Sequence, residues 1–88
     1  MEKEQLQLIS QVFGNELRKI RDIERDVTQE QFAQDTGIGP EHISEIERGK
    51  RLPRIDTLLK LRNAGVNINL IFDRIIQELD ANGIDLTE

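Results

Sequence analysis

The sequence predicts an all-α fold, a five-helix bundle whose first helix is extended at its N-terminus. Apolar residues recur at steps of three and four over five stretches, which is the period of an amphipathic helix. Glycine or proline marks most of the boundaries between these stretches, and none shows the apolar-polar alternation of a half-buried strand. A chain of 88 residues is the size of one small domain, so we expect a single domain over residues 1–88.

The first helix is predicted over residues 2–25. Its apolar stripe consists of Leu6, Ile9, Phe13, Leu17 and Ile20. Leu8 and Val12 widen this stripe beyond what one neighbouring helix needs for burial. Asp26 and Val27 are expected to form the loop that follows.

Two short helices joined by a tight turn are predicted next. Thr28 and Gln31 stand at the capping-box spacing, at which a hydroxyl and an amide each satisfy a backbone amide at the helix start. Gly37 is expected to end the first helix in a left-handed conformation, which glycine adopts without a Cβ penalty. Gly39 can cap the second helix, and Pro40 at its first position lacks only an amide that would be unpaired anyway.

The apolar side chains of residues 28–48 are spaced to close on one shared core. They are Phe32, Ala33, Ile38, Ile43 and Ile46. Ala33 is small, which suits a point where two backbones approach each other closely. Two helices that cross steeply around a glycine turn have the helix-turn-helix geometry.

Two further helices complete the predicted bundle. The fourth is carried by Ile55, Leu58, Leu59 and Leu61. It follows Pro53, and Gly65 ends it. The fifth spans residues 67–82, starts with Asn67 or Asn69 as its cap, and ends before a short tail. Its apolar residues repeat at helical spacing, and they are Ile68, Ile71, Phe72, Ile75, Ile76 and Leu79.

Composition argues against several classes of protein. Without cysteine the chain has no disulfide frame and no thiol nucleophile. His42 is the only histidine, so we expect a solvated or phosphate-facing side chain and neither a metal site nor a cofactor. No grouping of residues suggests catalysis, so we expect no enzyme. No apolar run reaches a membrane span and the N-terminus does not resemble a signal peptide, which predicts a cytoplasmic protein.

The net charge of −5 is unevenly distributed along the chain. Residues 1–16 and 73–88 carry the excess of acid, whereas residues 17–72 hold ten basic and nine acidic side chains. Four cations follow directly after the second short helix: Arg48, Lys50, Arg51 and Arg54. Screening over about 8 Å at cellular salt lets such a local patch attract an anion despite distant acids.

Twelve positions of the central stretch match the pattern of a known family. They are Thr28, Gln29, Phe32, Ala33, Gly37, Ile38, Ile43, Ser44, Ile46, Glu47, Gly49 and Lys50. The stretch resembles the phage-repressor, Cro and Xre-type helix-turn-helix family, which has the lambda-repressor-like DNA-binding domain. With flanking apolar positions the likeness covers residues 13–72, far more than a short motif. The link before Thr28 is one residue longer than the family usually has.

The resemblance implies how the chain would contact double-stranded DNA. Helix 28–36 would lie across the backbone, and helix 40–48 would enter the major groove. The residues expected to face base edges are Pro40, Glu41, His42, Ser44 and Glu45. Those expected to contact phosphates are Gln29, Arg48, Lys50, Arg51 and Arg54. The resemblance also implies a structural ion pair between Arg21 and Glu47.

The family's first helix starts near Phe13, so residues 1–12 are interpreted as an N-terminal helical extension. It can pack on its own chain or on a second copy, and we favour the second copy because a short chain offers limited cover. A homodimer would present two helices to half-sites about 34 Å apart. The expected dimer surface comprises Leu8, Val12, Phe72, Ile75, Ile76 and Leu79.

Glu41 and Glu45 depart from the family pattern, in which donors are frequent at these positions. A carboxylate accepts from cytosine but cannot form the bidentate contacts of Arg with guanine or Gln with adenine. Three interpretations stay open: a cytosine-rich or indirectly read operator, a solvated helix face, or contact with a regulatory protein partner. The basic backbone-contact positions favour a sequence-specific transcriptional regulator, a repressor, over a protein-interaction module such as an antirepressor or regulatory subunit.

Overall fold

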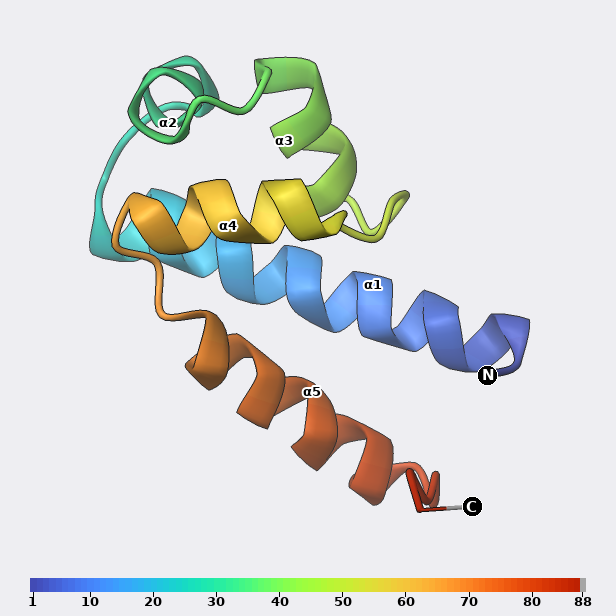
Figure 1. Ribbon diagram of the computed structural model, residues 1–88. Helices are drawn as coiled ribbons and strands as arrows, with labels where there is room; N and C mark the ends of the chain where they lie inside the picture. Colours follow the sequence, from blue (N-terminus) through green and yellow to red (C-terminus); the bar gives the residue numbers. More distant parts are fainter. Residues whose placement is uncertain (88) are drawn as a thin grey trace.

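The computed structural model describes residues 1–87, which form five α-helices (Figure 1). The helices are α1 (Lys3–Arg18), α2 (Gln29–Thr36), α3 (Pro40–Glu47), α4 (Ile55–Asn63) and α5 (Ile68–Ala81). A π-helical segment, η1 (Lys19–Glu24), directly continues α1. No strand occurs in this part of the chain. The predicted all-α bundle is therefore confirmed.

The first helix differs from the prediction in its last turns. We expected a regular helix over residues 2–25, but the final six helical residues are π-helical. The backbone amide of Arg25 accordingly donates to the carbonyl five residues earlier, on Ile20, at 2.9 Å. A π-helical segment accommodates an additional residue within a helix. The longer link expected before Thr28 stays a prediction, and a π-helical segment just ahead of it is compatible with an additional residue.

The helix-turn-helix segment starts and stops as predicted. The Thr28 hydroxyl accepts from the Gln31 amide at 3.1 Å, and the Gln31 side chain accepts from the Thr28 amide at 2.9 Å. Gly37 adopts a left-handed φ of 76°, which allows α2 to end abruptly. Gly39 caps α3, with Pro40 in its first turn. Local backbone chemistry therefore fixes the boundaries of both helices.

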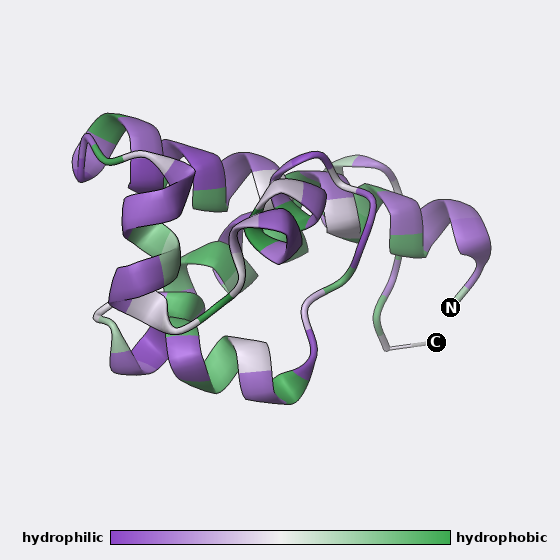
Figure 2. Ribbon diagram, turned by 90° about the horizontal axis from the view of Figure 1, so that it is seen from above, coloured by the Kyte–Doolittle hydropathy of each residue, from purple (hydrophilic) through white to green (hydrophobic). Residues whose placement is uncertain are grey.

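A single apolar core joins the five helices. It comprises Phe13, Leu17, Ile20, Phe32, Ile38, Ile43, Ile46, Leu61, Val66, Ile71, Ile75 and Leu79. Seen from above, apolar segments gather where the helices meet, and the outer sides of the ribbons are mostly hydrophilic (Figure 2). In Figure 1, α1 runs between the pair α2 and α3 on one side and α5 on the other. The core thus holds α3 against α1, while α2 packs against α3 and α4.

Gly14 on α1 sits where this helix meets the end of α3. A Cβ atom at this position would collide with the carbonyl oxygen of Ile46 and lie 2.9 Å from that of Glu47. Both obstacles are backbone atoms, which cannot move aside as a flexible side chain can. The close approach of α1 and α3 therefore requires glycine at this position.

The N-terminal extension packs on its own chain. α1 contacts α5 along its length, and Leu8, Val12 and Ile84 all pack partly buried against the core. The expectation that a second copy covers this stripe is therefore wrong for most of it. The short chain supplies its own cover because α5 returns along α1.

The structure also corrects part of the expected dimer surface. Ile75 and Leu79 on α5 are buried in the core of the single chain, with 8% and 2% of their surface exposed. They face α1, so they cannot reach a partner. Phe72 and Ile76 lie at the edge of the same apolar face of α5 and stay exposed. Asn67 caps this helix, its side chain accepting from the Leu70 amide at 3.1 Å.

Replacing Gly14 with alanine is predicted to destabilise the fold. In an ordinary helix interior this change gains up to about 1 kcal/mol. Here the clash with α3 outweighs that gain, and we expect a net loss of about 2 kcal/mol or more in urea unfolding. Gly39→Ala is the matched control, because no atom lies within 4 Å of its Cβ position. An equal effect of both substitutions would contradict the close-approach assignment.

Candidate nucleic-acid interface

A buried ion pair between Arg21 and Glu47 fixes α3 from the inside. The Arg21 Nε donates to Glu47 Oε2 at 2.7 Å, and its Nη2 donates to Oε1 at 2.9 Å. The remaining terminal nitrogen donates to the carbonyl of Val27 at 2.8 Å. This bidentate geometry is the strongest arrangement of an arginine–carboxylate pair. The hydrogen bonds that Arg21 donates to the Glu47 carboxylate raise the pKa of Arg21 above its ordinary value, although burial opposes the charge.

Gln29, at the start of α2, joins the same network. Its side-chain nitrogen donates to Glu47 Oε1 at 3.1 Å. The network therefore links η1, α2 and α3 through one carboxylate. Gln29 was expected to contact a phosphate; its amide nitrogen carries a second hydrogen, which this bond does not use.

The two faces of α3 are sharply different. Ile43 and Ile46 are fully buried in the core. Pro40 and Glu41 are exposed, and Ser44 and Glu45 are half-buried, together with His42. The residues expected to face base edges are thus all more accessible than the two core isoleucines. α3 lies beside α2 at one end of the bundle (Figure 1).

His42 is less accessible than predicted. Its Nε2 atom is buried and has no hydrogen-bond partner within residues 1–87. A solvated or phosphate-facing side chain was expected, but only the rest of the ring can face outward. Helical periodicity places His42 on the outer face of α3, but it carries no information on the side-chain conformation that buries Nε2.

The loop after α3 is tied tightly to the helix end. Gly49 has a left-handed φ of 72°. Its amide donates to the carbonyl of Ile46 at 3.0 Å, and the Lys50 amide donates to the carbonyl of Glu45 at 3.0 Å. These two bonds form the Schellman motif, which turns the chain back over the last turn of a helix. The cations of the loop are therefore held beside α3.

The four predicted phosphate-contacting cations all lie exposed in or next to this loop. Arg48 Nε donates to the Ser44 carbonyl at 3.3 Å. Arg51 Nε lies 3.3 Å from a carboxylate oxygen of Glu45, and Arg54 Nε lies 3.8 Å from one of Asp56; they are the ion pairs of the loop. Lys50 has no ion-pair partner within the described residues. The positive charge of the sequence cluster is thus accessible to an anion.

Sequence reasoning missed Arg25, which connects the end of η1 with α4 and α2. Its Nη2 donates to the Ala64 carbonyl at the end of α4, at 2.9 Å. Its guanidinium also stacks over the Phe32 ring, 5.5 Å from the centroid. No local pattern signals either contact, because both depend on the π-helical path of η1.

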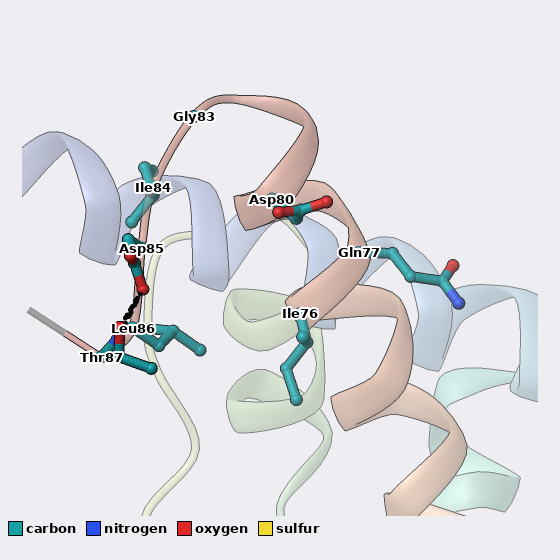
Figure 3. Close-up of a pocket in the computed structure, with 8 residues that line it drawn as sticks. All are labelled: Ile76, Gln77, Asp80, Gly83, Ile84, Asp85, Leu86 and Thr87. Atoms are coloured by element: carbon teal, nitrogen blue, oxygen red, sulfur yellow. Dashed lines mark hydrogen bonds between the residues drawn. The ribbon is translucent and has the colours of Figure 1, made fainter.

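Other kinds of site have less support in the structure. Residues 1–87 contain no group of three His, Asp or Glu side chains that could hold a metal ion. No helix in the same range has the length and apolar character to cross a membrane. An open hollow of about 540 Å³ lies between α5 and the C-terminal tail, and Figure 3 shows Ile76 and Leu86 on its walls. This hollow lies on α5, whereas the four cations lie in or next to the loop after α3. The hollow is therefore not part of the candidate interface.

Removing one partner of the buried ion pair is predicted to be costly. Glu47→Ala leaves the Arg21 charge buried without compensation, and we expect a loss of about 3 kcal/mol in unfolding free energy. The double variant Arg21→Met with Glu47→Leu should recover much of that loss. Arg54→Ala is the control, because an exposed ion pair contributes about 1 kcal/mol or less. Additive losses in the double variant would contradict a coupled pair.

Comparison with known proteins agrees with this geometry. The family model described as helix-turn-helix matches residues 17–64, more than half of the chain. The control protein C.MunI from Mycoplasma sp is 40% identical over 58 residues, which cover 66% of this chain and 77% of that protein. No solved structure matches significantly. With its capped α2, glycine turn and outward α3, the chain belongs to the Xre-type helix-turn-helix family of DNA-binding transcriptional regulators.

Proposed function

We propose that the protein binds double-stranded DNA sequence-specifically, with α3 in the major groove, as a non-enzymatic homodimeric repressor. The observation that carries the proposal is the two-sided character of α3. Its inner side is sealed by Ile43 and Ile46 and clamped through Glu47, while its outer side is polar and bordered by cations. A helix fixed in this way can enter a groove without losing its packing.

The phosphate contacts would come from both sides of α3. Gln29 would use its second amide hydrogen on one strand, assisted by the free backbone amides at the start of α2. Arg48, Lys50 and Arg54 would contact the backbone on the other side. Such contacts set the register of α3 but carry no sequence information directly.

Base contacts would come from the outer side of α3. Pro40, Glu41 and Ser44 lie there, together with the accessible part of His42 and with Glu45. Glu41 sits in the first turn of α3, where the helix dipole favours a negative side chain. Its presence is therefore compatible with DNA contact, although it is exposed and could also contact a basic protein partner. That interaction module is the second candidate function.

The exposed apolar residues of α5 and α4 provide a surface for the dimer. Phe72 and Ile76 are 41% and 51% exposed one turn apart on α5, and Leu59 on α4 is 63% exposed. Leu86 faces the hollow next to Ile76 (Figure 3). Exposed apolar side chains that lie close together mark association surfaces, and Phe72 and Ile76 meet this condition on α5. A second copy is the proposed occupant, because a single α3 buries too little surface to be selective.

The relative named control protein supports a regulatory role. A repressor has to be in the same compartment as the DNA that carries its operator. A cytoplasmic location is therefore part of this proposal. No ligand or cofactor is needed for the proposed contacts with DNA.

Titration of a randomised duplex pool at two salt concentrations tests DNA binding. A protein that displaces counterions from several phosphates loses affinity steeply as salt rises. We expect this loss together with enrichment of a two-fold symmetric sequence. Absence of binding even at low salt would favour the protein-interaction module instead.

Lys50→Ala is predicted to weaken binding to every duplex by a similar factor. It removes one phosphate contact, so the slope of log affinity against log salt should decrease by about one. Lys60→Ala on α4 removes the same charge from an exposed position outside the interface and should leave the slope unchanged. A base-specific effect of Lys50→Ala would contradict its assignment to the backbone.

Ile76→Lys is predicted to convert a dimer into a folded monomer. The lysine would place a charge in the apolar contact, yet the exposed position should tolerate it within a single chain. Sedimentation should show the mass falling by half, with circular dichroism unchanged. Ile23→Lys is the control, since this side chain is also exposed but lies on η1. If neither variant changes the mass, the dimer uses another surface or does not form.

A further inference from the structure

The ion pair between Arg51 and Glu45 joins two residues with different expected roles. Glu45 lies on α3 and was assigned to base edges, whereas Arg51 lies in the loop and was assigned to phosphates. The Arg51 Nε lies 3.3 Å from Glu45 Oε2, with side-chain exposures of 51% and 37%. Because each residue alters what the other can contact, their roles have to be considered together.

The backbone turn after α3 brings Arg51 close to Glu45. The Lys50 amide donates to the carbonyl of Glu45 itself, and Gly49 supplies the left-handed residue that the turn needs. The next residue, Arg51, consequently starts its side chain close to Glu45. Little additional ordering is needed to bring the two charges together.

The ion pair leaves the terminal nitrogens of Arg51 available for a contact with DNA. The nearest contact of Arg51 with Glu45 is made by Nε, and the two terminal nitrogens of Arg51 donate no hydrogen bond within residues 1–87. Two such nitrogens match the O6 and N7 acceptors of guanine in the major groove, the commonest specific contact of arginine. The carboxylate nearest to the guanidinium belongs to Glu45 on α3, a residue expected to face the base edges.

The other two arginines of the cluster are held differently. Arg48 is tied to the backbone carbonyl of Ser44, and Arg54 pairs loosely with Asp56 at the start of α4. Neither is attached to a side chain that was assigned to base edges. Their geometry suits phosphate contact, and they serve as internal comparisons for Arg51.

The pair also accounts for the unusual acidity of α3. A lone carboxylate at position 45 would be repelled by phosphates as the helix enters the groove. With Arg51 beside it, this charge is compensated inside the protein. Glu45 then contributes to recognition through Arg51 and needs no cytosine partner of its own.

We infer that Arg51 reads a guanine through its terminal nitrogens and that Glu45 is the positioning residue that directs it to the base edge. The inference rests on the proposed function, since it assumes that α3 enters the major groove. It revises the roles expected for both residues: Arg51 becomes a specificity-determining residue, and Glu45 acts without a direct base contact.

The test uses the full-length chain and the duplex selected from a randomised pool. Binding of each variant is measured to this duplex, to all single-base changes of it, and to a copy with 7-deazaguanine at the position in question. Arg51→Lys keeps the charge but loses the paired nitrogens, and Glu45→Gln keeps the size but loses the charge. Lys50→Ala is the phosphate-contact control, and circular dichroism checks folding.

We expect Arg51→Lys to reduce the preference for one guanine about tenfold or more, with binding to unrelated duplexes nearly unchanged. Glu45→Gln should reduce preference at the same base pair, and Glu45→Asp should restore part of it. The 7-deazaguanine duplex should bind the wild-type chain and Arg51→Lys about equally. Lys50→Ala should lower affinity for all duplexes alike.

Three outcomes would overturn the inference. Arg51→Lys and Arg51→Ala could both leave every base preference intact, which would make Arg51 a backbone contact; the alanine variant is needed because lysine can still donate to guanine. Glu45→Gln could leave the guanine preference unchanged, or it could change a base pair that Arg51→Lys does not, which would make Glu45 a direct reader. A wild-type chain that binds no duplex at low salt would instead refute the proposed function, which distinguishes the two failures.

Discussion

The Arg21–Glu47 ion pair joins the parts of the chain whose relative position decides where α3 points. One partner lies on η1 and the other at the end of α3, while Gln29 of α2 shares the carboxylate. Buried charges tolerate little displacement, because a separated pair leaves each charge without its partner. Gly14 lets α1 approach the same end of α3. Charge and close packing together hold the helix-turn-helix as a rigid unit.

The outer surface follows from this internal fixation. Since Ile43, Ile46 and Glu47 occupy the inner side of α3, the polar side chains between them face outward. The Schellman turn at Gly49 then places the cations beside that face. An overall charge of −5 is compatible with DNA binding because the excess acid lies mainly in the two ends of the sequence. Local arrangement, and not net charge, determines what this surface attracts.

Features that depend on local chemistry could be predicted from the sequence, and those that depend on distant contacts could not. The caps at Thr28 and Asn67 and the left-handed Gly37 are local, and the structure has all three. Periodicity identified α5 but not how much of its wide apolar face the rest of the chain covers, so Ile75 and Leu79 were placed wrongly. The same limit applies to the π-helical end of α1, the need for Gly14 and the buried His42 nitrogen. Each depends on contacts between residues that are distant in the sequence. The pairing of Glu45 with Arg51 arises only once the loop turns back.

Backbone amide shifts recorded while the protein is titrated with its selected duplex test the central claim most directly. The claim is that α3 and its basic loop form the surface that meets DNA. The largest shifts should then fall on residues 40–51 and at the start of α2, with the amides of the core-facing side of α1 little changed. Shifts confined to α5 and the N-terminal part of α1 would place the duplex elsewhere and contradict the account.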